Sequence, residues 1–302
     1  MTAGQVVDIE GRRFRLSNLD KVFYPDSGFT KGDVIDYYVR VAPVLLPHVR
    51  DRPLTLKRYP DGVAASSFFE KNVSRHAPDW VRTVRIDTPG STRGSESADF
   101  ALVQDLPTLV WAAHLASIEL HIPQWTVGPR GGLRDPDLLV FDLDPGEPAT
   151  IVECCTVARW LRDELDADGL SAHPKTSGSK GLQLYAPVRA RSGERTSAYA
   201  KRLAERLEQA HPELVVSRMA KNLRGGKVLI DWSQNNPKKT TVAPYSLRAR
   251  PSPTVSTPVT WSEVESCETP EDLTFVAAEV LDRIAESGDL FEPLLAANRP
   301  PL

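Results

Sequence analysis

The chain has 302 residues, a length that suits one large domain or two lobes and excludes a mini-protein held together by disulfides or metals. Hydrophobic residues make up 41% and charged residues 25%, close to globular averages, which excludes a disordered chain or a fibrous repeat. The formal net charge of −3 on its own argues against a nucleic-acid partner, because nucleic-acid-binding domains are often basic.

The charge is unevenly distributed along the chain. Residues 261–302 contain ten acidic residues against two arginines, a net charge of −8, which leaves +5 for residues 1–260. Within that basic part, residues 218–250 carry eight lysines and arginines and a single acid, Asp231. Such a cluster is either a solvated surface or a site for a polyanion, and the residues alone leave both open. The charge of the whole chain therefore does not exclude nucleic acid.

The sequence shows no membrane or export signal. The N-terminal residues lack the apolar stretch of a signal peptide, and no segment approaches the roughly 18 apolar residues of a transmembrane helix. The three cysteines, Cys154, Cys155 and Cys267, lack the CxxC spacing of a zinc site. We therefore expect a cytoplasmic protein with reduced thiols and no membrane partner.

The N-terminal half combines helical and strand patterns. Residues 33–48 have the apolar spacing of an amphipathic helix, and residues 53–59 alternate as a strand. In that strand Lys57 lies on the face opposite the core, because successive side chains point to opposite sides. Residues 99–120 carry a helical apolar pattern after a proline.

The C-terminal half alternates strands with helices and ends in an acidic helical segment, residues 261–302. A stretch rich in proline, serine and threonine, residues 251–260, reads as a connector between the body and this segment. We expect strands at 138–144 and 227–232 and helices at 150–167, 196–210 and 269–287.

Two aspartates in the strand 138–144 are the strongest chemical feature. Asp142 and Asp144 lie about 6.6 Å apart along one side of the strand, while the apolar residues between them face the core. Carboxylates fixed this close together repel each other and are normally stabilised by a cation, and oxygen ligands suit Mg²⁺ or Mn²⁺. The alternative is a strand end with two solvated acids.

Asp231 is the third candidate ligand, isolated among basic residues in the apolar strand 227–232. Three converging aspartates are what a two-metal phosphoryl-transfer site requires, because the two ions share ligands and still bind substrate oxygens. The residues alone do not show that the three converge, and an aspartate in such a setting is more often a residue of a salt bridge than a metal ligand.

A glycine-punctuated turn, residues 176–181, supplies possible phosphate ligands. Its sequence Thr-Ser-Gly-Ser-Lys-Gly offers hydroxyls, an ammonium and backbone N–H groups next to glycines. The spacing does not match the P-loop, and the turn leads into a strand rather than a helix, which disfavours a Walker fold.

Taken together, these motifs resemble one family. The DLD strand, TSGSKGL, and VLIDWSQN followed by TTVAPYSLRAR occur in this order in the polymerase domain of bacterial ATP-dependent DNA ligase D, a member of the archaeo-eukaryotic primase superfamily. NLDKVFYP, TKGDVIDYY, LKRYPDG, FFEK and ELHIPQW are also similar, so that the resemblance covers residues 14–250. It implies an α+β fold, a primase-like catalytic core with two central β-sheets flanked by helices, in a single domain over residues 1–302 that stands alone.

The resemblance also implies roles for individual residues. The family's catalytic, metal-binding aspartates fall on Asp142, Asp144 and Asp231. Its contacts to the nucleotide and its triphosphate fall on Lys57, His121, Ser177, Lys180, Gln183, Gln234 and Arg248. Its DNA contacts fall on Asn18, Lys21, Lys31, Phe68, Phe69, Lys221 and Arg224, of which the first three grip a 5′-phosphate and the phenylalanines stack on template bases.

Several of these residues have an ordinary structural interpretation without the resemblance. His121 would be a core histidine, and Lys21 and Lys31 would be surface lysines. Phe68 and Phe69 would belong to a strand, and because neighbouring strand residues face opposite ways, we expect only one ring to be exposed.

The chain departs from the family at one position. Members usually read SGxKGLH, whereas this chain has Gln183 in place of the histidine that approaches the nucleotide's phosphates. Glutamine donates through its amide but carries no charge. We therefore expect reduced or altered activity with the metal site intact.

The activity that the resemblance implies is primer extension on a DNA template. The enzyme would be a nucleotidyltransferase that uses two Mn²⁺ or Mg²⁺ ions and NTPs or dNTPs, often ribonucleotides, to fill short gaps with a 5′-phosphate in non-homologous end joining. Candidate partners are Ku and a DNA ligase, at the bacterial nucleoid. A DNA-end-binding or bridging module with weak or no polymerase activity is the main alternative, and a two-metal nuclease is a third.

Overall fold

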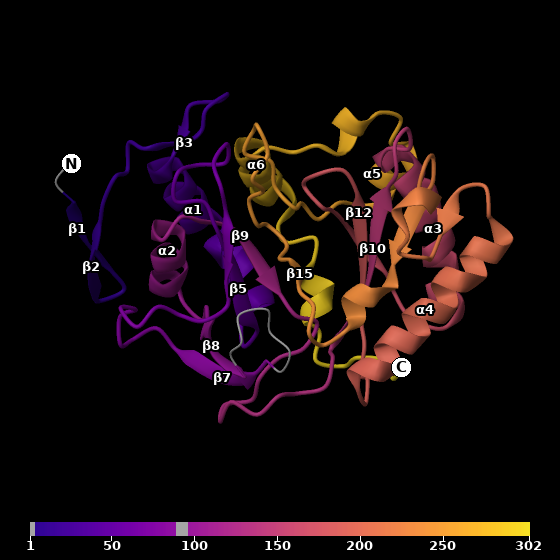
Figure 1. Ribbon diagram of the computed structural model, residues 1–302, viewed down its shortest axis with the longest axis horizontal. Helices are drawn as coiled ribbons and strands as arrows, with labels where there is room; N and C mark the ends of the chain where they lie inside the picture. Colours follow the sequence, from indigo (N-terminus) through magenta and orange to yellow (C-terminus); the bar gives the residue numbers. More distant parts are fainter. Residues whose placement is uncertain (1–3, 89–95) are drawn as a thin grey trace.

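Two β-sheets organise the computed structural model, which describes residues 4–88 and 96–302 (Figure 1). The six-stranded sheet has the order β15-β9-β5-β8-β7, with β6 paired to β5, and the five-stranded sheet has the order β11-β12-β10-β14-β13. Two hairpins, β1–β2 and β3–β4, lie outside them. The strands are β1 Gln5–Ile9, β2 Arg12–Leu16, β3 Val22–Tyr24, β4 Phe29–Thr30, β5 Pro53–Arg58, β6 Phe68–Glu70, β7 Thr83–Asp87, β8 Ser97–Leu102, β9 Ser117–Ile122, β10 Leu138–Pro145, β11 His173–Thr176, β12 Leu182–Pro187, β13 Val215–Val216, β14 Val228–Asp231 and β15 Thr241–Val242.

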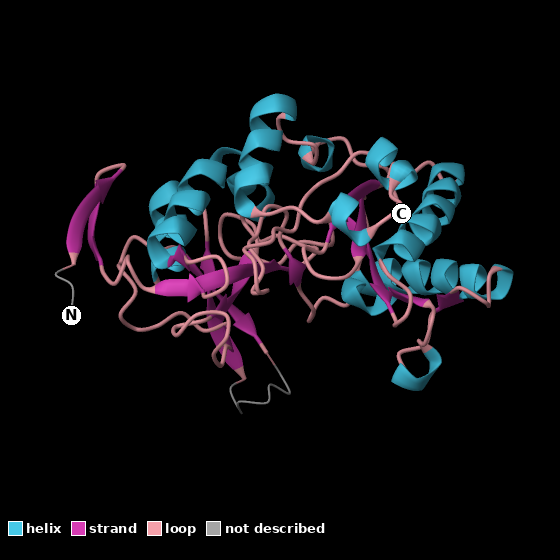
Figure 2. Cartoon of the chain, turned by 90° about the horizontal axis from the view of Figure 1, so that it is seen from above, coloured by secondary structure: helices cyan, strands magenta, loops and turns pink. Residues whose placement is uncertain are grey.

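Helices lie on the outer side of each sheet (Figures 1 and 2). α1 and α2 accompany the six-stranded sheet, and α3 and α4 cover the five-stranded sheet. This helix–sheet–sheet–helix arrangement confirms the expected α+β fold with two central sheets. The helices are α1 Lys31–Val49, α2 Leu106–His114, α3 Ile151–Ala167, α4 Gly193–Ala210, α5 Trp261–Ser266 and α6 Ala277–Ser287, with 3₁₀ turns η1 Lys221–Leu223, η2 Trp232–Asn235, η3 Pro270–Leu273 and η4 Glu292–Leu295. None of the described helices is both long and apolar enough to cross a bilayer.

Local sequence signals explain where the longest helices begin. Thr30 and Thr150 cap α1 and α3 through capping boxes, in which the threonine hydroxyl accepts from a backbone N–H and an acid three residues later accepts from the threonine N–H. α1 continues through Pro43 and Pro47 to Val49 and keeps a buried face against the sheet.

Two expected helices are wrong in part. Residues 99–120 form the end of β8, then α2, then β9, because Ile118, Leu120 and Ile122 alternate as one buried face of a strand. A short apolar run fits the residue spacing of a helix as well as that of a strand. In this segment, pairing within the sheet favours the strand. The expected helix 269–287 is divided into η3 and α6, separated by residues 274–276, of which Val276 caps α6.

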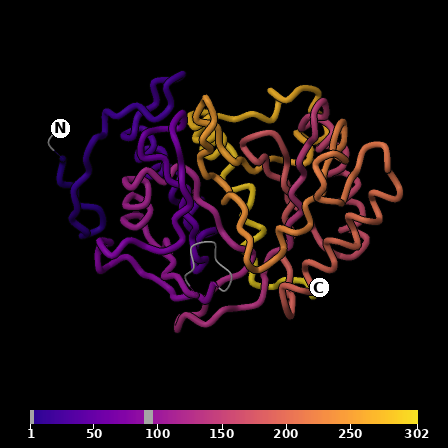
Figure 3. Tube along the Cα trace, in the orientation of Figure 1, coloured from indigo at the N-terminus to yellow at the C-terminus, as the bar shows by residue number. Residues whose placement is uncertain are grey.

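The C-terminal segment returns to the middle of the molecule (Figure 3). The connector 251–260 is largely buried: Val255 pairs with Leu247, and Pro258 with Lys175 of β11. The Asp289 carboxylate accepts hydrogen bonds from Tyr245 Oη (2.6 Å) and His48 Nε2 (2.8 Å), which joins this segment to α1. The acidic segment is therefore built into the core.

The polar faces of the two sheets point away from their helices. In β10, Leu139, Phe141 and Leu143 pack against α3, so Asp142 and Asp144 face the other way. In β5, Leu54 and Leu56 pack in the N-terminal core, so Lys57 faces away from it. Strand alternation thus places the candidate residues of both sheets in the region between them.

Candidate active site

Asp142 lies at the centre of the five-stranded sheet, between two other candidate residues. Its register partner on β14 is Asp231, and its partner on β12 is Gln183. Gln183 Nε2 donates to Asp142 Oδ1 at 2.8 Å. Antiparallel pairing of three strands, remote from one another in the sequence, therefore brings these residues together.

The two carboxylates of β10 carry an electrostatic cost. Burial and the neighbouring Asp144 carboxylate raise the pKa of Asp142. Desolvation and the charge of Asp231 raise the pKa of Asp144, whose side chain is the more exposed of the two. Both shifts have the direction expected of acids that a bound cation would stabilise.

Asp231 lies close to Asp142 and Asp144, but its carboxylate is hydrogen-bonded to other residues. Its Oδ1 accepts from the Ser233 N–H at 3.0 Å, and its Oδ2 accepts from Gln234 Nε2 at 2.8 Å, with Lys239 Nζ 3.9 Å away. As these side chains stand, no three Asp, Glu, His or Cys residues in the described part of the chain are arranged to hold a metal. The donor chemistry of three neighbouring carboxylates fits a hard divalent cation, and the ligand set stays a prediction.

A second charged cluster gathers around Glu119 on β9. The buried Glu119 carboxylate lies 2.9 Å from His121 Nε2, 3.6 Å from Lys57 Nζ and 3.5 Å from Arg248 Nε. Burial alone would raise the pKa of Glu119, but the His121 hydrogen bond and the charges of Arg248, His121 and Lys57 lower it far below its usual range. One ionised acid thus holds three predicted nucleotide contacts together.

Burial and the nearby cations act in the same direction on the pKa of the histidine. Burial, with the charges of Arg248 and Lys57, lowers the pKa of His121 despite its bond to Glu119. Arg248 Nε is buried 3.5 Å from Glu119 Oε1 and makes no hydrogen bond within the described residues, while 18% of the Arg248 side chain stays exposed. Sequence reasoning missed Glu119, because its segment was read as part of a helix.

The turn 176–181 adjoins this cluster through Arg248, whose guanidinium donates to the carbonyl of Ser177. Ser177 Oγ accepts from the backbone N–H groups of Ser179 (3.2 Å) and Gly181 (3.1 Å). Those two donors, expected to be free for phosphate, are therefore engaged within the turn. Gly178 is required here, because its φ is +66° and a Cβ would approach the Val255 backbone to 2.6 Å.

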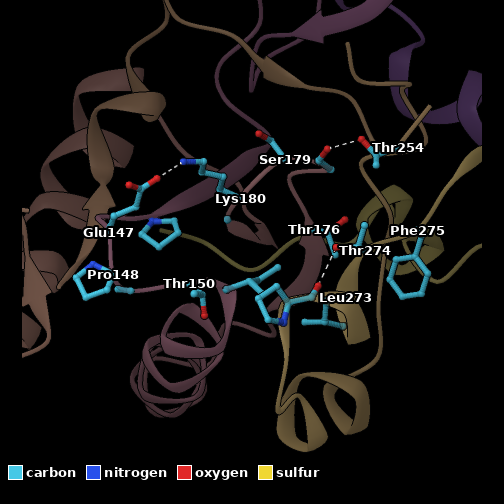
Figure 4. A pocket seen from close by; sticks show the side chains of 16 residues that line it. Glu147, Pro148, Thr150, Thr176, Ser179, Lys180, Thr254, Leu273, Thr274 and Phe275 are labelled. Atoms are coloured by element: carbon cyan, nitrogen blue, oxygen red, sulfur yellow. Dashed lines mark hydrogen bonds and ion pairs between the residues drawn. The ribbon is translucent and has the colours of Figure 1, made fainter. Parts of the chain in front are cut away.

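Lys180 extends from the same turn toward solvent and pairs with Glu147 Oε1 at 2.7 Å. Behind the turn lies a cavity of about 250 Å³ between the start of α3 and η3, with Thr150, Leu273 and Phe275 in its wall (Figure 4). Its walls are mostly apolar, and Glu147 and Lys180 are the charged residues among those that line it.

The three residues expected at a 5′-phosphate lie together at the start of α1. Lys21 Nζ donates to Asp61 Oδ1 (2.6 Å) and the Pro60 carbonyl, and Lys31 Nζ donates to the Ser17 carbonyl (2.9 Å). Burial, then the charges of Lys21 and Arg58, lower the pKa of Lys31 to about 8. Asn18 is exposed beside them, and the Lys21 N–H donates to its carbonyl.

Both rings of the predicted stacking pair are exposed, so the expectation of one buried ring is wrong. Phe68 is 39% and Phe69 is 49% exposed on β6, which pairs with the solvent-facing end of β5. Phe69 lies edge-on to His121, with centroids 5.6 Å apart, next to Lys57. Phe69 therefore borders the Glu119 cluster, whereas Phe68 lies 5.2 Å from the Arg58 guanidinium.

The predicted DNA-contacting basic loop packs close to Asp144. Lys221 begins η1, and Arg224 ends it with its guanidinium donating to the Met219 carbonyl at 2.6 Å. Arg224 packs on the end of β10: a Cβ at Gly146 would lie 2.0 Å from its carbonyl oxygen. The charge of Arg224 also opposes the rise in the pKa of Asp144.

Comparison with known proteins agrees with this arrangement. A family model described as LigD, primase-polymerase domain, matches residues 30–291. The solved polymerase domain from Mycobacterium tuberculosis ligase D in complex with DNA has a TM-score of 0.88 and 45% identity, covering 94% of this chain and 99% of that chain.

Longer proteins of end joining are also similar. The multifunctional non-homologous end joining protein LigD of Mycolicibacterium smegmatis is 46% identical over 93% of this chain, and the bifunctional LigD of Bacillus subtilis is 34% identical over 91%. The chain spans 36% and 43% of their lengths. From the matched fold and the extent of the family match, the chain belongs to the LigD primase-polymerase domain family.

Proposed function

We propose that the protein is a metal-dependent nucleotidyltransferase that extends a primer 3′-end on a DNA template with ribo- or deoxyribonucleoside triphosphates. The observation that carries the proposal is the placement of Asp142, Asp144 and Asp231 on adjacent strands, facing a cationic cluster on the other sheet. Carboxylates for metal ions beside cations for phosphates are the two requirements of phosphoryl transfer.

Asp142, Asp144 and Asp231 would hold Mg²⁺ or Mn²⁺ in this reaction. When bound, the divalent ions supply the positive charge that favours the primer alkoxide and neutralises the triphosphate. The primer 3′-oxygen forms a bond to the α-phosphorus, the bond from that phosphorus to the bridging oxygen breaks, and pyrophosphate leaves.

The protein's own cations would bind the triphosphate. Arg248 and Lys57 belong to the same cluster and keep 18% and 25% of their side chains exposed, so both can neutralise phosphate oxygens. Glu119 keeps these side chains in place before the nucleotide arrives, which reduces the cost of ordering them on binding. Lys180 would join after leaving Glu147.

The biological setting follows from the relatives. Because similar proteins are named for non-homologous end joining, the proposed substrate is a short gap at a DNA break on the bacterial chromosome, with a 5′-phosphate on the downstream strand. The similar solved domain is in complex with DNA. Ku and a DNA ligase are the proposed partners.

One primer-extension assay with labelled ribonucleotides and Mn²⁺ separates the proposal from its alternatives. A polymerase lengthens the primer, and a nuclease shortens it. A module that only binds or bridges DNA ends leaves the primer length unchanged while it retards the DNA on a native gel. Only the first result supports the proposal.

Substituting both lysines of the proposed phosphate site, Lys21→Ala with Lys31→Ala, is expected to remove the preference for a 5′-phosphorylated downstream strand. Each ammonium that contacts a phosphate contributes about 1.5–3 kcal/mol, so the preference should fall by roughly tenfold or more. Fluorescence anisotropy with phosphorylated and hydroxyl-ended gaps measures it. An unchanged ratio of the two affinities would refute the role.

The same preference should depend on pH in the wild-type protein. The pKa of Lys31 is lowered to about 8, so its ammonium is present below pH 8 and is lost as the pH rises through that value. We therefore expect the phosphate preference to fall between pH 7 and pH 9, and to fall less in Lys31→Arg, since arginine stays charged. Equal pH profiles of the two proteins would contradict the assignment.

A further inference from the structure

Lys175 on β11 is fully buried, with 0% exposure. Its ammonium donates to Gln183 Oε1 at 2.6 Å and to Ser256 Oγ, and it lies 5.5 Å from the centre of the Tyr185 ring. Among the described residues, no carboxylate lies within ion-pair distance of it. Burial, with the charge of Arg248, lowers the pKa of Lys175 well below its usual value, because an ammonium without a counter-ion is removed from water.

Gln183 connects this lysine to the candidate metal site. Lys175 Nζ donates to Gln183 whether or not it is charged, and an ionised carboxylate can only accept, whereas an amide does both. Lys175 therefore fixes Gln183 Oε1 on its own side, which directs Nε2 to Asp142 Oδ1 at 2.8 Å. The lysine thereby determines which way the amide points.

Neighbouring polar residues hold the Lys175 side chain in place. Ser256 Oγ donates to the Thr176 carbonyl at 2.8 Å, so the hydroxyl that receives the ammonium is attached to the backbone of β11. Tyr185 Oη lies within hydrogen-bond distance of Gln183 Oε1 (3.3 Å) and of the Thr241 hydroxyl (2.7 Å). The buried chain of contacts from Ser256 through Lys175 and Gln183 ends on Asp142.

We propose that Lys175 is a positioning residue that orients the Asp142 carboxylate for metal binding by fixing the amide of Gln183. The inference rests on the proposed function. Gln183 suits this role, since its amide accepts from Lys175 and donates to Asp142. Partners that orient a metal ligand typically change metal affinity about 10–100-fold.

The test is Mn²⁺ binding without nucleotide, measured from the electron paramagnetic resonance signal of free Mn²⁺. Lys175→Met keeps the length of the side chain and removes its donors, and about tenfold weaker binding is expected. Gln183→Met should weaken binding to a similar extent. The double variant should bind no more weakly than either single variant, because Lys175 acts through Gln183.

Controls separate this role from general destabilisation. Lys201→Met on α4, an exposed lysine 3.7 Å from Glu205, should leave Mn²⁺ binding unchanged. Ser256→Ala keeps Lys175 and removes one of its hydrogen-bond partners, so it should weaken Mn²⁺ binding less than Lys175→Met does. It also serves as the test if Lys175→Met does not fold. Thermal unfolding of each variant reports its stability.

Wild-type affinity in Lys175→Met, or additive losses in the double variant, would overturn the inference while leaving the proposed function intact. If Lys175→Met does not fold, a wild-type Mn²⁺ affinity of the Ser256→Ala variant would overturn the inference as well. Absence of both Mn²⁺ binding and primer extension in the wild-type protein would overturn the inference together with the proposed function.

Discussion

Replacing both Asp142 and Asp144 by alanine is expected to lower nucleotide incorporation about a thousandfold or more and to leave DNA affinity within about twofold. The two carboxylates would hold the divalent ions, whose charge is worth several kcal/mol in the transition state, and each 1.36 kcal/mol corresponds to a factor of ten. DNA binding should persist, because the proposed strand contacts lie on other elements.

A matched control is available on α3. Asp163→Ala with Asp166→Ala removes two exposed carboxylates and the same charge, so incorporation should stay near the wild-type rate. Single-turnover extension measures the rate, and fluorescence anisotropy measures DNA affinity. Incorporation by the Asp142/Asp144 variant within tenfold of wild type would exclude these residues from catalysis.

Glu119→Gln is expected to lower the free energy of unfolding by about 3–5 kcal/mol, the typical cost of removing one partner of a buried charge pair. Glutamine has almost the same shape but leaves Arg248 and Lys57 without their buried counter-ion. The KM for the nucleotide should also rise, because these cations lose their alignment. Urea unfolding and steady-state kinetics measure the two effects.

The acid dependence of stability gives an independent check on Glu119. The pKa of Glu119 is depressed in the folded protein, so its contribution is present above its ordinary value of 4.5 and is lost as the pH falls toward the lowered value. Glu119→Gln should therefore lose stability less steeply than wild type below pH 4.5. Glu147→Gln, at an exposed pair, should unfold like wild type, and equal acid profiles for the Glu119 variant and wild type would contradict its role.

Strand alternation was sufficient to predict the carboxylate face of the site. The pattern of residues 138–144 placed Asp142 and Asp144 opposite the core, and the structure shows that face turned from α3. The apolar strand 227–232 made Asp231 a candidate, the resemblance gave it a metal-binding role, and the register of β10 and β14 sets it directly opposite Asp142. The sheet pairing itself could not be predicted from the residues, because it joins segments about 90 positions apart.

The features that were missed depend on tertiary contacts. Glu119 lies in a segment whose apolar residues fit a helix as well as a strand, so its partners could not be foreseen. Lys175 gives no signal in the sequence, since only the fold buries it beside Gln183. The backbone donors of the turn 176–181 were expected to be free, whereas Ser177 Oγ occupies two of them.

Charge along the sequence gives a similar lesson. The net charge of −3 averages a basic body with an acidic C-terminal segment, and the two are not separate in space. Asp289 of that segment accepts hydrogen bonds from Tyr245 and His48 in the core, so this acidic residue stabilises the packing of the segment. The positions of Lys21, Lys31 and the 218–250 cluster therefore indicate a DNA partner better than the sum of charges does.

The most direct test of the central claim is pyrophosphate release during primer extension on gapped DNA with Mn²⁺, by the wild-type protein and the Asp142→Ala/Asp144→Ala variant. Nucleotidyl transfer at this site predicts one pyrophosphate for each nucleotide added by the wild-type protein, and neither product from the variant. Equal release and extension by the two proteins, or no extension by the wild type, would contradict the claim.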